Sequence, residues 1–251
     1  MSVSYSSSEK REPLQQVLQR PDLWKGRNGP AQSSSGLSTG YVDLDKKLLY
    51  KGWPQRGLVE LQQNSFGHAE WHLLLPSMKA LLAEPGYIFL INPPAIPYAP
   101  ALMQQGIDPK RLLVVETGKK RDCMASVLEI LAANCSIALC FWEPREKLFY
   151  AELRKLQLAA SQSSSLCFLM REAPSNKARN YSSSPAVLKL RLQNYPQGLR
   201  LSINKQRGSY RQGEVLLPWP NYLTSSPFLK AATDQNEMDQ GSNILRFKGS
   251  S

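Results

Sequence analysis

Short apolar runs alternate with helical patterns through most of the chain. Five runs have the length of a strand, at residues 58–61, 86–92, 111–117, 136–142 and 165–171. Apolar residues recur at helical spacing over 42–49, 71–82, 97–106, 122–133 and 145–160. In the last of these segments we expect a buried stripe made of Leu148, Phe149, Leu153 and Leu156. Strands that alternate with such helices indicate βαβ units and a parallel sheet.

The pattern changes after residue 187. Leucines alternate with polar residues over 188–193, and the same period of two returns over 199–204. The stretch NYPQG between these segments is typical of a turn, which predicts a hairpin. The sequence therefore predicts an α/β fold with a mainly parallel central sheet, flanked by helices and ending in an antiparallel hairpin.

The two ends of the chain differ from this body. Residues 1–35 predict a flexible segment with a short amphipathic helix, residues 36–222 one folded domain, and residues 223–251 a flexible polar tail. Each end carries apolar residues that are candidate contacts for a partner: Leu14, Val17 and Leu18 in the first, and Ile244, Leu245 and Phe247 in the second. A helix packed on its own domain is the alternative for the N-terminal set.

Charge and cysteine content narrow the class of protein. The net charge is +11, and nine basic residues against one acid lie between Arg171 and Arg211. This concentration favours a polyanionic partner, most simply nucleic acid, although a solvated surface would also explain it. The four cysteines lack metal-binding spacing, so we expect buried, reduced thiols. Without an export signal or a membrane-length apolar run, we expect a cytoplasmic protein with no membrane contact.

The stretch VELQQNSFGHAEWHLLLP, residues 59–76, has the strand, polar loop and helix layout of a phosphate-binding loop. In a working loop a lysine meets the β- and γ-phosphate oxygens, and a Ser or Thr hydroxyl binds magnesium. Here Gly67 stands at the last glycine, His68 replaces the lysine, and Glu70 brings negative charge to the place of the triphosphate. Imidazole is mostly neutral at pH 7. We interpret the stretch as a retired nucleotide site.

Several strings resemble RecA-like domains. LSTGYVDLDKKLLYKGWPQRGLVEL resembles the entry into the first core strand, and QQGIDPKRLLVVE the loop into the third. The closer resemblance, over residues 36–220, is to ImuA, the RecA-like accessory protein of SOS-induced translesion DNA synthesis, and to the related SulA-type proteins. It rests on GWPQRGLVELQ, LLLPSMKAL, PPAIPYAPALMQQGID and LRKLQLAASQSSSLCFLMR.

This resemblance implies a RecA-like scaffold without its chemistry. Where RecA carries a catalytic glutamate, this chain has Pro93 and Pro94. Near the magnesium-binding aspartate it has Glu143, which is either that carboxylate displaced by one position or a surface acid. We therefore expect no enzymatic activity and no cofactor. His68 and His72 have the i, i+4 spacing of zinc ligands but lack a third ligand, so we expect no metal.

The resemblance also suggests a DNA-binding loop. In RecA a loop after the fourth core strand contacts DNA, and its place here is residues 171–187. That segment offers cations for phosphates and one ring for stacking. The candidate DNA-binding residues, in the loop and the following hairpin, are Arg171, Lys177, Arg179, Tyr181, Lys205, Arg207 and Arg211. A surface loop with incidental charge is the alternative.

The implied partners are an ImuB-like polymerase homologue and a DnaE-type error-prone polymerase, with RecA and single-stranded DNA as further candidates. The leading interpretation is a non-enzymatic adaptor of SOS-induced translesion synthesis. Two others stay open: a SulA-like division inhibitor that binds the tubulin-like septum protein, and a weak RecA-like ATPase with a rearranged site. Filamentation on expression without DNA damage would favour the inhibitor, and nucleotide-dependent thermal stabilisation the ATPase.

Overall fold

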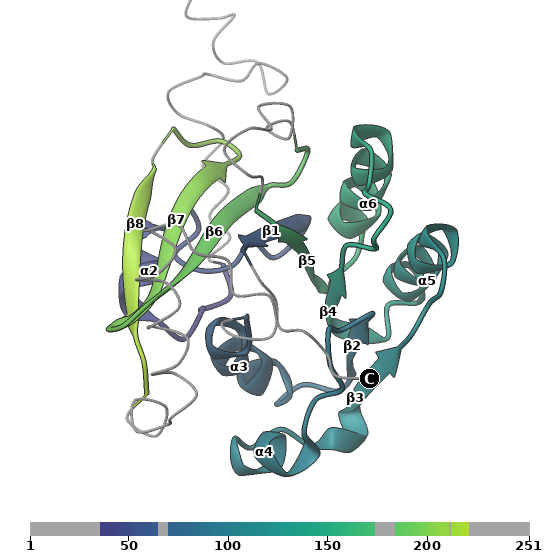
Figure 1. The fold of residues 1–251 in the computed structure, drawn as a ribbon, viewed down its shortest axis with the longest axis horizontal. Helices are drawn as coiled ribbons and strands as arrows, with labels where there is room; N and C mark the ends of the chain where they lie inside the picture. The colour runs from purple at the N-terminus through teal and green to yellow at the C-terminus, as the bar shows by residue number, and fades with distance from the viewer. Residues whose placement is uncertain (1–35, 65–69, 174–183, 211, 221–251) are drawn as a thin grey trace, which may run out of the picture. The chain divides into compact units, whose positions relative to one another are not determined.

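A single mixed sheet organises the domain (Figure 1). The structure, a computed structural model, describes residues 36–64, 70–173, 184–210 and 212–220. The strands in this part of the chain are β1 (Leu58–Gln63), β2 (Tyr87–Ile91), β3 (Leu112–Val115), β4 (Ser136–Trp142), β5 (Leu166–Glu172), β6 (Leu188–Tyr195), β7 (Gly198–Gln206) and β8 (Gly213–Pro218).

The strand order is β3-β2-β4-β5-β1-β6-β7-β8. Neighbouring strands from β3 to β6 in this order run parallel, whereas β6–β7 and β7–β8 are antiparallel pairs. The α/β class, the mainly parallel sheet and the closing hairpin predicted from the sequence are thus confirmed. β8 adds a third antiparallel strand to the hairpin.

Helices lie on both faces of the parallel strands. α3 (Glu70–Leu81) and α4 (Ala99–Gln104) lie on one side, and α5 (Lys120–Ala133) and α6 (Tyr150–Gln162) lie together on the other (Figure 1). The short helix α2 (Val42–Lys47) contacts β8, and a 3₁₀ turn at Pro109–Arg111 leads into β3. In the described ranges no helix has both the length and the apolar character needed to cross a membrane.

The start of α6 differs from the prediction. The sequence placed Phe149 in a buried helical stripe, but the helix begins at Tyr150 and the Phe149 side chain is 70% exposed. The reason is local hydrogen bonding: the Phe149 N–H donates to Glu152 Oε2 over 2.7 Å, which caps the first turn from inside the helix. Leu148, Leu153 and the rest of the stripe are buried as expected.

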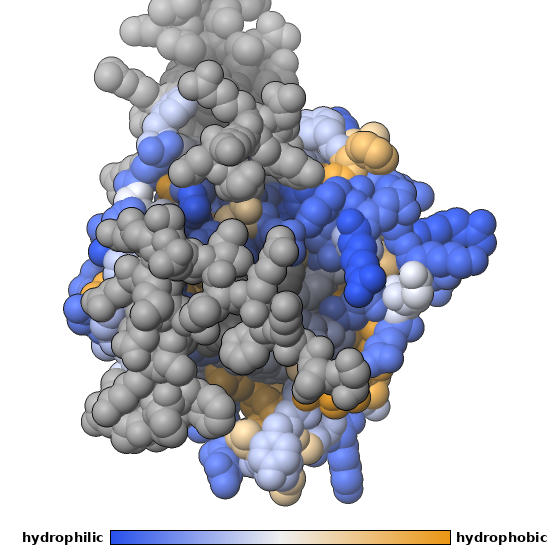
Figure 2. Space-filling view, in the orientation of Figure 1, coloured by the Kyte–Doolittle hydropathy of each residue, from blue (hydrophilic) through white to orange (hydrophobic). Residues whose placement is uncertain are grey.

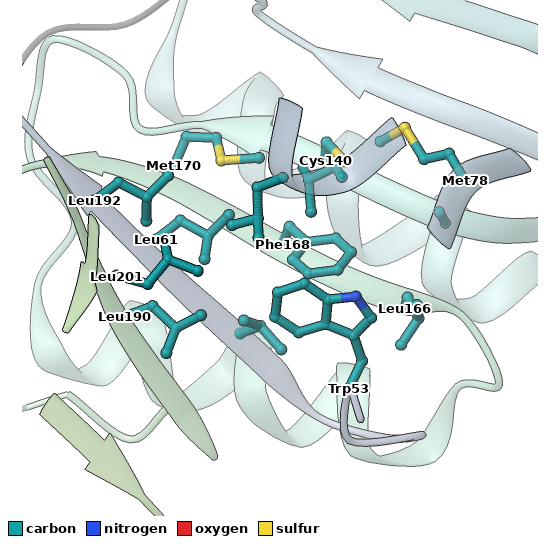
Figure 3. Packing of buried hydrophobic residues seen from close by; sticks show 14 of the residues in the cluster. Trp53, Leu61, Met78, Cys140, Leu166, Phe168, Met170, Leu190, Leu192 and Leu201 are labelled. Atoms are coloured by element: carbon teal, nitrogen blue, oxygen red, sulfur yellow. The ribbon is translucent and has the colours of Figure 1, made fainter. Parts of the chain in front are cut away.

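The larger apolar cluster lies between the sheet and the helices α2 and α3 (Figure 3). Trp53 is fully buried, its ring centre lies 5.1 Å from that of Phe168 in an edge-on arrangement, and its Nε1 donates to Ser77 Oγ over 2.7 Å. Leu61 and Met170, from adjacent strands, extend the contact along the sheet. This packing fixes the strands whose ends form the site described below.

The cysteines only partly follow the prediction. All four are free thiols, and Cys123, Cys140 and Cys167 are buried. Burial raises the pKa of the Cys140 and Cys167 thiols well above the ordinary value. Cys135 is exposed, so the expectation that all four are buried is wrong. Cys135 immediately precedes β4, where the chain enters the sheet from the surface.

We expect Leu61→Ala to lower the free energy of unfolding by about 2–5 kcal/mol, because the truncated side chain leaves a cavity in a fully buried position. Leu158→Ala is the matched control: this leucine lies on α6 and is 53% exposed, so its loss should change stability by less than about 0.5 kcal/mol. Urea unfolding followed by tryptophan fluorescence measures both. Similar losses in the two variants would contradict the described core.

Candidate functional site

The segment interpreted as a retired nucleotide loop joins β1 to α3 at the carboxyl edge of the parallel strands. Gly67 and His68 lie outside the described residues. Glu70, the first residue of α3, is buried, and Gln63 Nε2 at the end of β1 donates to its carboxylate over 3.1 Å. A buried carboxylate bonded to the end of β1 therefore stands two residues after the position of the missing lysine.

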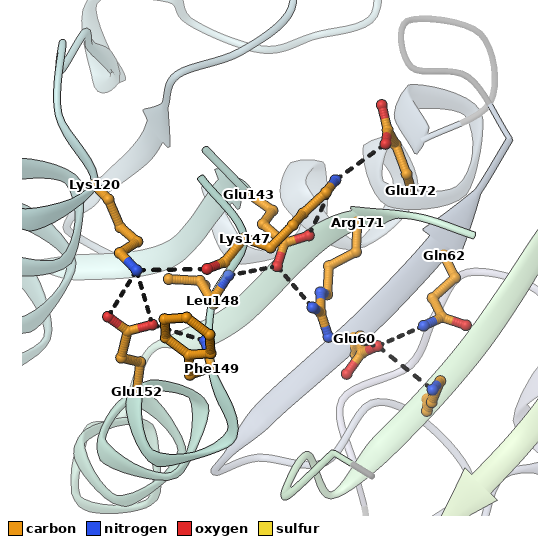
Figure 4. Close-up of polar contacts among 11 residues, drawn as sticks. Glu60, Gln62, Lys120, Glu143, Lys147, Leu148, Phe149, Glu152, Arg171 and Glu172 are labelled. Carbon is orange, nitrogen blue, oxygen red and sulfur yellow. Dashed lines mark hydrogen bonds and ion pairs between the residues drawn. The ribbon is translucent and has the colours of Figure 1, made fainter. Parts of the chain in front are cut away.

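Beside this segment, an arginine of β5 joins carboxylates from both neighbouring strands (Figure 4). Arg171 Nη2 lies 2.7 Å from Glu143 Oε1, and Arg171 Nη1 lies 3.5 Å from Glu60 Oε1. The side chains of Arg171, Glu143 and Glu60 are only 5%, 2% and 0% exposed. Because β5 runs between β4 and β1, one guanidinium reaches the acids on either side.

Glu143 is held by backbone contacts as well. Its N–H donates to Met170 O over 2.9 Å, which continues the pairing of β4 with β5 beyond Trp142. Its Oε1 also accepts the N–H of Leu148 over 3.0 Å and so fixes the chain that leads into α6. The interpretation of Glu143 as a surface acid is wrong. Its carboxylate is instead already occupied by Arg171 and by the backbone.

Two lysines complete the arrangement. Lys147 Nζ lies 3.0 Å from Glu172 and 3.6 Å from Glu143, and Lys189 Nζ on β6 lies 3.6 Å from Glu60. Three acids are thereby matched by three cations. We refer to this set as the ion-pair cluster: Glu60, Glu143, Lys147, Arg171, Glu172 and Lys189.

The cluster keeps its arginine charged. Burial alone would lower the pKa of the Arg171 guanidinium, but the hydrogen bond and charge of Glu143, together with those of Glu60, outweigh this effect and raise the pKa. A magnesium ion at this place would have to displace a buried, permanently charged group from its two acids. The arrangement is suited to holding three strands together, because the buried carboxylates of Glu60 and Glu143 already share Arg171 as a counter-ion.

At the end of β2, where RecA carries its catalytic glutamate, this chain has Asn92, Pro93 and Pro94. Asn92 follows β2 with a left-handed backbone (φ 52°), and its side chain exchanges hydrogen bonds with Thr117 at 2.7 and 2.8 Å, which ties the ends of β2 and β3 together. Pro93 and Pro94 line an open cleft of about 1270 Å³ beyond these strand ends. Six basic and five acidic residues line the cleft, so it has little preference for a triphosphate.

The His72 side chain packs against two aromatic rings. Its ring centre lies 5.6 Å from that of Tyr41 and 5.2 Å from that of Trp219. Desolvation by burial lowers its pKa against the opposing effect of the Pro218 carbonyl, so the ring is neutral at pH 7. No group of three or more potential metal ligands occurs among the described residues.

The candidate DNA-binding residues have four different outcomes in the structure. Arg171 is buried in the ion-pair cluster, which contradicts its expected place on a DNA-facing surface. Arg207 is exposed, as expected. Lys205 is half-buried and donates to Ser184 O over 2.6 Å; desolvation, aided by the charge of Arg207, lowers its pKa. Lys177, Arg179, Tyr181 and Arg211 lie outside the described residues, as do the candidate partner contacts Leu14, Val17, Leu18, Ile244, Leu245 and Phe247.

Sequence reasoning missed Glu60 and Lys189. A signal was present: Glu60 interrupts the apolar start of β1, and Lys189 alternates with leucines on β6. Such alternation ordinarily marks a solvent-facing position, so Lys189 was grouped with surface charge. The two residues are direct neighbours across the parallel pair of β1 and β6, a pairing that only the strand order reveals.

Comparison with known proteins adds little to this geometry. No family model and no curated protein matches the chain. Among solved structures, the chain is similar to the crystal structure of SulA from Pseudomonas aeruginosa, with 23% sequence identity over 45% of this chain and 98% of that one, at a TM-score of 0.35. A likeness at this level does not bear on function.

We expect Arg171→Met to lower the free energy of unfolding by about 3–5 kcal/mol at pH 7, because two buried carboxylates lose the guanidinium that they share. The double variant Glu143→Gln/Arg171→Met should lose less than the single one.

The matched control is Arg154→Met, an exposed arginine on α6, for which a change below about 0.5 kcal/mol is expected. Urea unfolding at pH 7 measures all three variants. A double variant as unstable as the single one would speak against the ion-pair cluster.

Proposed function

We propose that this chain is a non-enzymatic adaptor of SOS-induced translesion DNA synthesis, similar to ImuA. In this role it brings together an ImuB-like polymerase homologue and a DnaE-type error-prone polymerase, with RecA and DNA as further ligands. The observation that carries the non-enzymatic part is the placement of Arg171 between Glu60 and Glu143. The identity of the partners rests on the sequence resemblance.

The ion-pair cluster argues against ATP turnover. Phosphoryl transfer requires a magnesium ion and a positioned base or water-orienting group next to the phosphates. At the carboxyl edge described here, Glu143 is engaged by an internal guanidinium and Asn92 by Thr117. Each group is used to join strand ends, which supports a scaffold in preference to a catalyst.

An exposed apolar segment supports protein binding. The chain between β2 and β3 carries Ile96, Tyr98 and Met103, which are 75%, 73% and 63% exposed. They lie in and just before α4, and Figure 2 shows hydrophobic colouring on the part of the surface where this helix lies. Exposed apolar side chains gathered on one segment favour a protein partner.

The adaptor role can be tested by co-purification. The full-length protein should retain the ImuB-like and DnaE-type proteins of its own organism, and an Ile96→Ser/Met103→Ser variant should retain them less. Leu158→Ser is the control, because this leucine is also exposed (53%) but lies on α6. Retention of the tubulin-like septum protein, with no polymerase, would replace the adaptor with the SulA-like inhibitor.

Nucleotide should leave the protein unaffected. A site with a Kd of about 10 µM would add about 2.7 kcal/mol of stability at about 1 mM ligand. We expect about 1 mM MgATP to leave the melting temperature unchanged within about 1 °C and no phosphate to be released. ATP turnover that disappears in Glu143→Gln would favour the ATPase interpretation instead.

A further inference from the structure

The antiparallel strands present one face that no described helix covers. The buried apolar residues of β6, β7 and β8 all belong to the cluster on the α2 and α3 side. The second cluster, under α5 and α6, takes its strand residues from the parallel strands β1 to β5. The opposite side chains of the three antiparallel strands form what we call the β6–β8 face: Arg191, Gln193, Tyr195, Arg200, Ser202, Glu214 and Leu216.

The strand register sets these side chains in rows. Arg191 pairs with Ser202, which pairs with Glu214; in the next row Gln193 pairs with Arg200, which pairs with Leu216. Side chains on such diagonals are about 7–8 Å apart, so the two arginines are neighbours. All of these residues are half-buried or exposed, and Leu216 is 47% exposed.

The charge of this face is positive. Arg191 and Arg200 lie on it, and Lys205 and Arg207 follow at the end of β7. Glu214 is the acid on this face, and it accepts a hydrogen bond from Ser202 Oγ over 3.0 Å. Arg191 Nε is buried without a hydrogen-bond partner in the described part of the chain, which leaves a donor unmet. Such a surface attracts a polyanion.

An aromatic stack accompanies the charge. The Arg200 guanidinium carbon lies 3.8 Å from the centre of the Tyr195 ring, and Arg200 Nη1 donates to the Tyr195 hydroxyl over 2.9 Å. These contacts hold the planar cation and the ring together in a fixed orientation. Flat groups of this kind offer a stacking surface for a base, while guanidinium N–H groups bind phosphate oxygens.

We propose that the β6–β8 face binds single-stranded nucleic acid, with Arg191 and Arg200 on the phosphates and the Tyr195–Arg200 stack supporting a base. This inference deepens the proposed adaptor function, on which it rests for its biological setting. A duplex fits less well: its major groove, about 12 Å wide, admits a helix or a two-stranded ribbon. Here three strands about 4.8 Å apart continue into a wider sheet.

The test is fluorescence anisotropy of the full-length protein with a labelled oligothymidine of about 20 nucleotides, at salt concentrations from about 50 to 200 mM. We expect Arg191→Gln/Arg200→Gln to weaken binding roughly tenfold and to reduce the salt slope by about 1.4, since about 0.7 is lost for each phosphate contact. Tyr195→Leu should weaken binding but leave the salt slope unchanged, because it removes a stacking ring and no charge.

Lys46→Gln/Lys79→Gln is the matched control, since it removes the same charge from exposed positions on α2 and α3. It should bind as the unmodified protein does. Equal losses in both double variants would mean a response to net charge alone and would overturn the proposal. So would a duplex bound as tightly as the single strand, or no binding at about 50 mM salt.

The same arginine variant separates this inference from the proposed function. If it still co-purifies with the polymerase partners but has lost the oligonucleotide, the β6–β8 face is supported independently of partner binding. If the unmodified protein binds the oligonucleotide through this face but retains no polymerase, the adaptor function fails and the inference stands. Urea unfolding of each variant shows that a loss of binding is not a loss of folding.

Discussion

The contact between Arg171 and the carboxylates of Glu60 and Glu143 constrains the carboxyl edge of the sheet. It joins β5 to β1 on one side and to β4 on the other. Two buried acids are tolerated there only because a buried cation compensates them. Glu143 also fixes the start of the segment that leads to α6, and Glu60 receives Lys189 from β6. The arrangement thus reaches from the parallel strands into the antiparallel hairpin.

The two faces of the sheet beyond this cluster serve different purposes. One face buries the apolar residues of β6, β7 and β8 against the α2 and α3 side. The other is covered by α5 and α6 over the parallel strands and by no described helix over β6–β8. A sheet that is uncovered on one side of its antiparallel part has room for polar and charged side chains at every second position. That alternation is the physical basis of both the fold pattern and the proposed nucleic-acid surface.

Much of this architecture was predictable from the order of apolar residues. Each predicted strand and helix of the domain is present, because continuous apolar runs and period-two alternation report burial on two faces and on one face. Failures occurred where a single contact decides the outcome. Phe149 is exposed because its hydrogen bond to Glu152 sets the start of the helix. Arg171 is buried because it forms ion pairs with two buried carboxylates. The first contact is local to the start of α6, whereas the second is visible only when the strands are placed side by side.

Charge counting failed for a related reason. Nine basic residues in one segment predicted a cationic surface, but Lys189 and Arg171 neutralise buried acids, and Lys205 is tied to a backbone carbonyl. The residues that do give the uncovered face its charge, Arg191 and Arg200, were in the same count without being singled out. Their position on one face follows from register, which composition does not contain.

An internal counter-ion also has a consequence for control in the cell. In ATPases, binding and release of the metal-bound nucleotide couple the supply of ATP to a change of conformation. Here the charge that such a ligand would bring is part of the covalent chain and cannot dissociate. In the proposed adaptor role, the time at which the protein acts would therefore be set by its synthesis, its degradation or the concentration of its partners, and not by the supply of ATP.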